Sequence, residues 1–287
     1  MVKKINIITL SVILSAFFIF GCSNDMAGFA ASNDLDERLK SKNDFPFLDG
    51  ENKNGVNRNW RNITLGTSYK FIIVTDTHME DGDDFGLEKL PDAITKHDAK
   101  FAVNIGDITQ HGTEHDVDLF IKIADDLGVP FYPTIGNHDI YFGTWHVWRD
   151  KIGSTNYRID IKNGSNINTS LLFLDSANAF LGRSQIDWLE FELRKENPAH
   201  VFVFTHAAFF TTGIKMQQLT DTRERARVAH ILKSYNADIM FMGHSHQRAI
   251  NEAGGVRYVT FEDFKSTSIY IVVDVKPSGV TYKFDKL

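Results

Sequence analysis

Carboxylate, amide and imidazole side chains follow five of the apolar runs in this chain. They are, in chain order, Asp76, His78, Asp107, Asn137, His138, His206, His244 and His246. Imidazole nitrogens and carboxylate oxygens suit divalent ions such as Mn, Fe, Zn, Ni or Co. The residue types therefore indicate a metal site, and the absence of paired cysteines argues against a structural cysteine zinc site.

The number of candidate ligands predicts more than one ion. Seven of these residues are candidates for direct metal contact, which exceeds what a single ion needs. Two divalent ions about 3.5–4 Å apart could share one carboxylate, and Asp107 is our choice for that bridge. A hydroxide held between the two ions would be a nucleophile at neutral pH.

The elements that must position these residues are predicted as alternating strands and helices of an α/β layered domain. Short β-rich apolar runs predict strands at Tyr69–Thr75, Lys100–Ile105, Val129–Ile135, Ser170–Leu174, His200–Thr205, Ala237–Met242, Val256–Phe261 and Ser268–Val275. The last of them and a further strand flank Pro277-Ser278-Gly279, which predicts a terminal hairpin. Ligands of layered α/β folds bind beyond the carboxyl ends of strands, so the ligand-type residues should converge.

Helical spacing of apolar residues predicts two core-facing helices. One pattern consists of Val117, Phe120, Ile121 and Ala124, and the other of Val228, Ile231, Leu232 and Tyr235. A third helix is predicted to begin at Ser184, whose hydroxyl can cap it with Asp187 three positions on.

Length and charge limit the classes of function. A chain of 287 residues with 43% hydrophobic content can build one substantial core, and we assume one domain. The formal net charge of −6 comes without a block of lysine or arginine, so no nucleic-acid-binding patch is evident.

The N-terminus is typical of an exported lipoprotein. Lys3 and Lys4 precede a mainly apolar run that ends in Gly21-Cys22, which resembles a lipobox. We therefore interpret residues 1–22 as a lipoprotein signal peptide, residues 23–62 as a tether and residues 63–287 as the catalytic domain. This predicts a bacterial cell-envelope protein, extracytoplasmic and held at a membrane through lipidated Cys22. An uncleaved single-span anchor is the alternative.

Five short motifs, in order and in their strand context, resemble those of calcineurin-like metallophosphoesterases. They are Asp76-Thr77-His78, Gly106-Asp107, Gly136-Asn137-His138-Asp139, His206 and Gly243-His244-Ser245-His246. Each motif is weak alone, but the full set is specific and covers roughly Tyr69 to Arg248. The resemblance implies a fold of two mixed β-sheets flanked by helices, a four-layer α/β/β/α sandwich. It also implies hydrolysis of a small phosphate ester, a diester or a monoester, in which the hydroxide would attack phosphorus in line with the departing alkoxide.

The resemblance also implies roles for the residues. One metal would be held by Asp76, His78, Asp107 and His246, and the other by Asp107, Asn137, His206 and His244. His138 would lie near the substrate, where it stabilises the phosphoryl group or protonates the leaving oxygen. Asp139 would orient His138.

Residues around the motifs bear on the subtype and on the border of the site. Purple acid phosphatases have a tyrosine ligand where this chain has Gln110, so the layout is closer to a small cyclic-nucleotide-phosphodiesterase-like or a general phosphoesterase subtype. His111 and His146 could border the site. Arg248 could clamp a phosphate oxygen or cover a sheet edge. Three aromatic residues that follow Asp139 are predicted to be core residues; they are Tyr141, Trp145 and Trp148.

Two functions from other classes compete with a phosphoesterase. A surface lipoprotein could use the same fold to bind metal or a ligand without turnover, although no ligand or catalytic residue is missing here. An adhesin with a stabilising metal is the other, and a closed four-ligand site would distinguish it.

Overall fold

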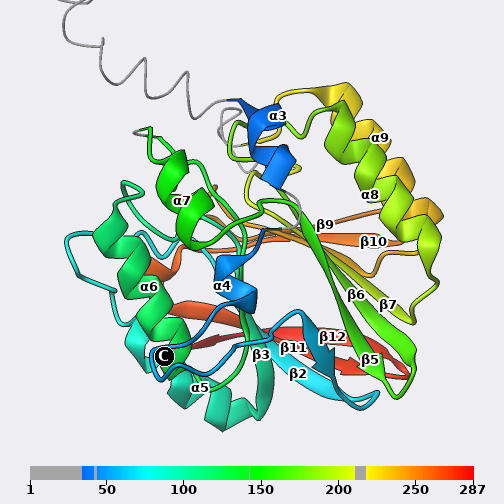
Figure 1. Ribbon diagram of the computed structural model, residues 1–287. Helices are drawn as coiled ribbons and strands as arrows, with labels where there is room; N and C mark the ends of the chain where they lie inside the picture. The colour runs from blue at the N-terminus through cyan, green and yellow to red at the C-terminus, as the bar shows by residue number, and fades with distance from the viewer. Residues whose placement is uncertain (1–33, 42–43, 142, 211–217) are drawn as a thin grey trace, which may run out of the picture.

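Two mixed β-sheets lie face to face, with helices on their outer sides (Figure 1). The computed structural model describes residues 34–41, 44–141, 143–210 and 218–287. Helices α5 (Leu90–His97) and α6 (Glu114–Asp126) cover one sheet, and α8 (Arg183–Lys195) and α9 (Thr222–Ser234) cover the other. This is the predicted four-layer α/β/β/α sandwich.

The smaller sheet has five strands in the order β12-β11-β2-β3-β4. Their bounds are β2 Tyr69–Val74, β3 Ala99–Asn104, β4 Phe131–Pro133, β11 Ile269–Lys276 and β12 Gly279–Lys286. Strands β2, β3 and β4 are parallel, so their carboxyl ends share one edge. Strands β11 and β12 form the predicted antiparallel hairpin, with Lys276 paired to Gly279 at the turn.

The larger sheet has seven strands in the order β1-β5-β6-β7-β8-β10-β9. Their bounds are β1 Asn62–Thr64, β5 Tyr157–Asn163, β6 Asn166–Leu174, β7 His200–Thr205, β8 Ile239–Met242, β9 Ala249–Ala253 and β10 Val256–Thr260. Strands β6, β7, β8 and β10 run parallel, which brings the ends of β7 and β8 to one edge.

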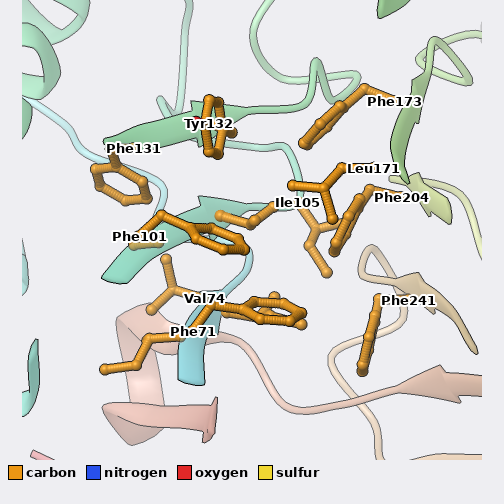
Figure 2. Packing of buried hydrophobic residues seen from close by; sticks show 14 of the residues in the cluster. Phe71, Val74, Phe101, Ile105, Phe131, Tyr132, Leu171, Phe173, Phe204 and Phe241 are labelled. Carbon is orange, nitrogen blue, oxygen red and sulfur yellow. The ribbon is translucent and has the colours of Figure 1, made fainter. Parts of the chain in front are cut away.

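Aromatic side chains fill the space between the two sheets (Figure 2). Phe71 stacks on Phe101 with ring centroids 4.6 Å apart, and Phe173 stacks on Phe204 at 4.9 Å. Phe71 also meets Phe202 edge to face at 5.4 Å, which joins the sheets. Each such pair contributes about 0.5–1.5 kcal/mol beyond its burial. This packing gives the strand ends a rigid base.

Helices α6 and α9 each begin where a polar side chain caps them. Thr113 accepts a hydrogen bond from the backbone N–H of Asp116 at the start of α6, and Asp221 accepts one from Arg223 at the start of α9. The third predicted helix is α8, which begins at Arg183, but the predicted Ser184 cap was wrong, because Gly182 is the N-cap and no side chain caps it. Glu224 instead accepts the N–H groups of Leu181 and Gly182 from outside the helix.

The chain before the first sheet is packed on the domain over its described part. Short helices α3 (Leu35–Arg38), η1 (Leu39–Ser41) and α4 (Pro46–Asp49) cross the molecule ahead of β1. Phe47 and Leu48 are fully buried, and Phe47 packs on Phe120 of α6. The structure therefore differs from the tether predicted for residues 23–62, because these apolar residues belong to the core.

The predicted signal peptide and Cys22 lie outside the described residues. Within the part of the chain that the structure describes, none of the helices has the length and apolar character needed to cross a bilayer. Two further helices complete the described fold: α7 (Trp145–Lys151) precedes β5, and α10 (Phe264–Thr267) precedes β11. A 3-10 helix, η2 (Leu87–Lys89), precedes α5.

Candidate metal centre

The predicted ligands converge at the carboxyl ends of five strands that come from both sheets. Asp76 and His78 follow β2, Asp107 follows β3, and Asn137 follows β4. His206 follows β7, and His244 and His246 follow β8. The parallel pairing of these strands, together with the face-to-face packing of the sheets, brings all seven side chains together.

Three overlapping groups of side chains each bring their ligand atoms within 4.8 Å of one another. The groups are Asp76, His78 and His246; His78, Asp107 and His138; and Asp107, His206 and His244. Asp107 belongs to two of them, on either side of the site. This position suits the bridging role predicted for its carboxylate.

His206 lies at the centre of the second half of the site. Its Nε2 is 3.0 Å from Asp107 Oδ2 and 3.2 Å from Asn137 Oδ1, while Nδ1 donates to the carbonyl oxygen of Ile105 at 2.8 Å. Burial opposes the charged imidazole, but the Asp107 carboxylate raises the pKa of His206 to about 9. Because Nδ1 is held by a backbone carbonyl, Nε2 is the atom that faces the side-chain oxygens of Asp107 and Asn137.

The first half of the site is built around Asp76. His246 Nε2 lies 3.1 Å from Asp76 Oδ1 and 3.3 Å from His78 Nε2. Burial opposes ionisation of Asp76, yet the hydrogen bond from His246 and the charge of His206 lower its pKa. Burial lowers the pKa of His78, so this imidazole is neutral and ready to act as a ligand.

His244 completes the set from the far side. Its backbone N–H donates to Asp76 Oδ2 at 3.0 Å, and its ring faces that of His206 with centroids 4.9 Å apart. Burial and the neighbouring His206 charge lower the pKa of His244 to about 4. A neutral imidazole beside a protonated one leaves His244 with a lone pair for a cation.

Backbone strain is concentrated at this site. Asp76, His78, Asp107, His244 and His246 all have positive φ values, between 44° and 66°. Such left-handed conformations cost of order 1 kcal/mol or more for non-glycine residues and persist where surrounding structure enforces them. At Gly136, an added Cβ would lie 2.1 Å from the backbone nitrogen of Asp107. The two motifs can approach this closely only with glycine there.

His138 lies next to the ligands with its ring fixed by the backbone. Its Nδ1 is 3.0 Å from the carbonyl oxygen of Gln110 and donates to it, which leaves Nε2 for the substrate side. Its ring meets that of His78 edge to face at 4.7 Å, and its N–H donates to Asp107 Oδ1 at 2.8 Å. Gln110 therefore holds the imidazole through its main chain.

Asp139 has a different role from the one predicted. Its carboxylate accepts hydrogen bonds from the backbone N–H groups of Ile108, Thr109 and Gly136, and from the Thr109 hydroxyl. Burial and the Asp107 charge raise the pKa of Asp139 to about 6. None of these contacts involves the His138 ring. Asp139 joins the loop after β3 to the loop after β4 and so acts on the ligands through the backbone.

The residues predicted to border the site divide into several kinds. His111 Nε2 lies 3.1 Å from Glu80 Oε1, and exposed His146 contacts the carbonyl of Gly143. Arg248 pairs with Glu262 and lies over the Phe284 ring at 3.7 Å, so it covers a sheet edge.

Trp145 and Trp148 are buried in the core as predicted. Tyr141 is not, because its ring lies against His138 with centroids 5.0 Å apart.

Sequence reasoning missed several side chains that hold the ligands. The Thr75 hydroxyl donates to Asp76 Oδ2 at 2.6 Å, and Asp263 Oδ1 lies 3.7 Å from His246 Nδ1. Asp263 is also the N-cap of α10, accepting from the N–H of Ser266. An acidic residue three positions before serine is a capping signal that could have been read, but its contact with His246 depends on the fold.

The donor set fits metal ions. Two imidazole Nε2 atoms and a carboxylate oxygen meet around Asp76, and His206 Nε2, a ring nitrogen of His244 and a carboxylate oxygen gather around Asp107. Such nitrogens at contact distance need a proton or a cation between them. The donors are oxygen and nitrogen atoms that suit first-row divalent ions, and their number suffices for two.

Comparison with known proteins identifies the family. The model of the calcineurin-like phosphoesterase family matches residues 69–248. The chain belongs to this family. As a calcineurin-like phosphoesterase it is a metal-dependent phosphoester hydrolase, which confirms the predicted family and class of enzyme.

Individual relatives support the same assignment. The phosphoesterase is 27% identical over 187 residues to a protein of Fibrobacter succinogenes named "Probable cyclic nucleotide phosphodiesterase", which covers 60% of this chain and 71% of the relative. Among solved structures, a purple acid phosphatase from yellow lupin has a TM-score of 0.63 at 12% identity, covering 77% of this chain and 52% of the other. A dimetal phosphatase from Danio rerio has a TM-score of 0.55 at 13% identity, covering 75% and 98%. These two likenesses concern the fold.

Proposed function

We propose that this phosphoesterase hydrolyses small phosphate diesters outside the cytoplasm, at the site between the two sheets. The observation that carries the proposal is the complete set of seven donors around Asp107, with His138 fixed beside them. Loss of turnover in a relative would be expected to replace at least one of these residues.

The residues divide the chemistry between them. Asp76, His78, Asp107 and His246 would hold one ion, and Asp107, Asn137, His206 and His244 the other. When bound, the two cations polarise the phosphoryl oxygens and lower the pKa of water. Hydrolysis adds the oxygen of water to phosphorus, breaks the ester P–O bond and moves one proton from the water to the leaving oxygen. His138 would supply that proton from Nε2 as an imidazolium, because Nδ1–H is engaged by the Gln110 carbonyl, and the ring would regain a proton from the attacking water.

The charges around the site favour a diester. In the part of the chain that the structure describes, the cationic side chains following the last motif and on α10 are paired with glutamates: Arg248 with Glu262, and Lys265 with Glu80. A monoester carries a second negative charge near neutral pH, since its second pKa is about 6. A diester has a single charge and does not need a further cation. The name of the Fibrobacter relative agrees with this preference.

We test the proposal with the fragment 34–287, stripped of metal and resupplied with Mn, Fe, Zn, Ni or Co. Turnover of bis-p-nitrophenyl phosphate should exceed that of p-nitrophenyl phosphate. Asp107→Ala and His138→Ala should abolish it, whereas His230→Ala, at an exposed position of α9, should not. Tight binding of two ions with no turnover would instead favour a metal-binding or ligand-binding lipoprotein.

The location is part of the proposal and rests on the sequence. Cys22 is the only cysteine and follows a positively charged and then apolar leader. We expect it to be lipidated in a bacterial host. Metabolic labelling with an alkyne fatty acid should label the wild-type chain and not Cys22→Ser, and labelling of neither would argue against a lipid anchor.

A further inference from the structure

Tyr141 lies at the wall of the site, although its neighbours in sequence belong to the core. Ile140 and Trp145 are buried, whereas Tyr141 is half-buried. Its ring lies against that of His138, with centroids 5.0 Å apart and planes at 53°. Tyr141 therefore occupies the same side of the site as the residue that faces the substrate.

The phenol of Tyr141 lies on the side of the candidate metal ligands, as its ring contact with His138 requires. Burial raises the pKa of Tyr141 and the Asp107 charge raises it further, while the side-chain amide of Asn137 lowers it. The Oδ1 of Asn137 faces His206 Nε2 at 3.2 Å and is the atom suited to a cation. The Tyr141 hydroxyl therefore faces the same space as the candidate ligands and His138.

We propose that the Tyr141 hydroxyl donates a hydrogen bond to a phosphoryl oxygen of the substrate and holds the phosphate against His138. This inference rests on the proposed phosphoesterase function and names one more contact at the same site. A neutral donor adds no positive charge, which suits the singly charged diester. The aromatic ring also keeps water away from one face of His138.

A structural role for Tyr141 predicts different behaviour. If the phenol served only to orient Asn137, its loss would weaken metal binding before it affected phosphate. If it only packed on His138, phenylalanine would replace it fully. A direct contact with phosphate predicts that Tyr141→Phe keeps the metals and the ring packing but binds phosphate more weakly.

The experiment compares Tyr141→Phe with wild type and with Tyr235→Phe, all loaded with Mn. Tyr235 is a matched control because its hydroxyl lies at the end of α9 and contacts Arg194. We measure the Mn content, the affinity for inorganic phosphate by calorimetry, and kcat/KM for bis-p-nitrophenyl phosphate. Hydrogen bonds to charged groups contribute enough to predict about 10- to 100-fold losses in phosphate affinity and in kcat/KM for Tyr141→Phe, with two ions retained.

The outcomes separate the inference from the proposed function. Unchanged phosphate affinity in Tyr141→Phe, with an active wild type, would overturn the inference alone. Loss of Mn together with phosphate affinity would overturn it too, in favour of a role in orienting Asn137. A wild type that binds Mn and phosphate but turns over no ester would overturn the proposed function. Calorimetry would then still decide whether Tyr141 contacts phosphate.

Discussion

Arg38 and Asp175 form a bidentate ion pair across 137 positions of the chain, with Nε to Oδ2 at 2.7 Å and Nη2 to Oδ1 at 2.9 Å. Both side chains are almost completely buried. Asp175 follows β6, and the next residue, Ser176, contacts the residues on both sides of His206. The N-terminal segment is thereby fixed to the edge of the sheet that carries the site.

Removal of one partner of this pair should be strongly destabilising. Arg38→Ala would leave a buried carboxylate without its counter-charge, which costs about 3–5 kcal/mol. We expect urea unfolding of the fragment 34–287 to show that loss. Lys40→Ala is the control, since Lys40 pairs with Glu37 in solvent, where such pairs contribute little to stability. Equal effects of the two substitutions would contradict the role given to Arg38.

Truncation at the predicted domain boundary should also destabilise the protein. Among the residues ahead of β1 that the structure describes, five apolar side chains are buried: Leu35, Leu39, Phe45, Phe47 and Leu48. Each contributes about 1.5–3 kcal/mol, and their sum is comparable to the whole stability of a typical domain, about 5–15 kcal/mol. The fragment 63–287 should therefore be unfolded or insoluble by circular dichroism and gel filtration, and 34–287 should be folded. A cooperative unfolding transition in 63–287 would show that the segment is dispensable.

This boundary shows where sequence patterns stop being informative. Residues 34–62 are mostly polar, and their buried residues follow neither helical nor strand spacing, so composition alone indicated a tether. The apolar runs of the central strands predicted those strands to within one or two residues at most ends. Strands β1, β5 and β9 were missed because they are edge or near-edge strands with polar residues, such as Asn251 and Glu252.

The candidate site could be predicted from its motifs, but its supporting contacts could not. Motif order and strand ends predicted that the seven candidate ligands converge, because parallel strands bring their carboxyl ends together. The role of Asp139 was wrong because sequence proximity to His138 says nothing of side-chain direction. In the structure three backbone N–H groups donate to that carboxylate and hold it between the loops that follow β3 and β4.

Asp139→Ala should therefore act on stability and metal binding and not through His138. The substitution leaves up to three buried N–H groups without an acceptor, each costing about 1–3 kcal/mol. We expect a loss of about 2–4 kcal/mol and weaker binding of Mn. A double-mutant cycle with His138→Ala, measured by urea unfolding, should give additive losses within about 0.5 kcal/mol. Strong coupling would mean that Asp139 works through the imidazole.

Metal loading should release protons, and the stability of the metal-free protein should depend on pH. The Asp107 carboxylate outweighs burial and raises the pKa of His206 to about 9, above the value of about 6.5 in the unfolded chain. The stabilisation from this charged pair is complete below pH 6.5 and disappears as the pH rises through 9. Metal-free protein should thus lose up to about 3 kcal/mol across that interval.

A metal ion changes this behaviour because it needs the neutral imidazole. Calorimetric titration with Mn at pH 7.5, repeated in HEPES and Tris, should report release of about one proton or more, and His206→Gln should reduce the number by about one. In Mn-loaded protein the stability should not fall between pH 6.5 and 9, because the ion replaces the proton between Asp107 and His206. Identical pH profiles with and without Mn would contradict metal binding at these two residues.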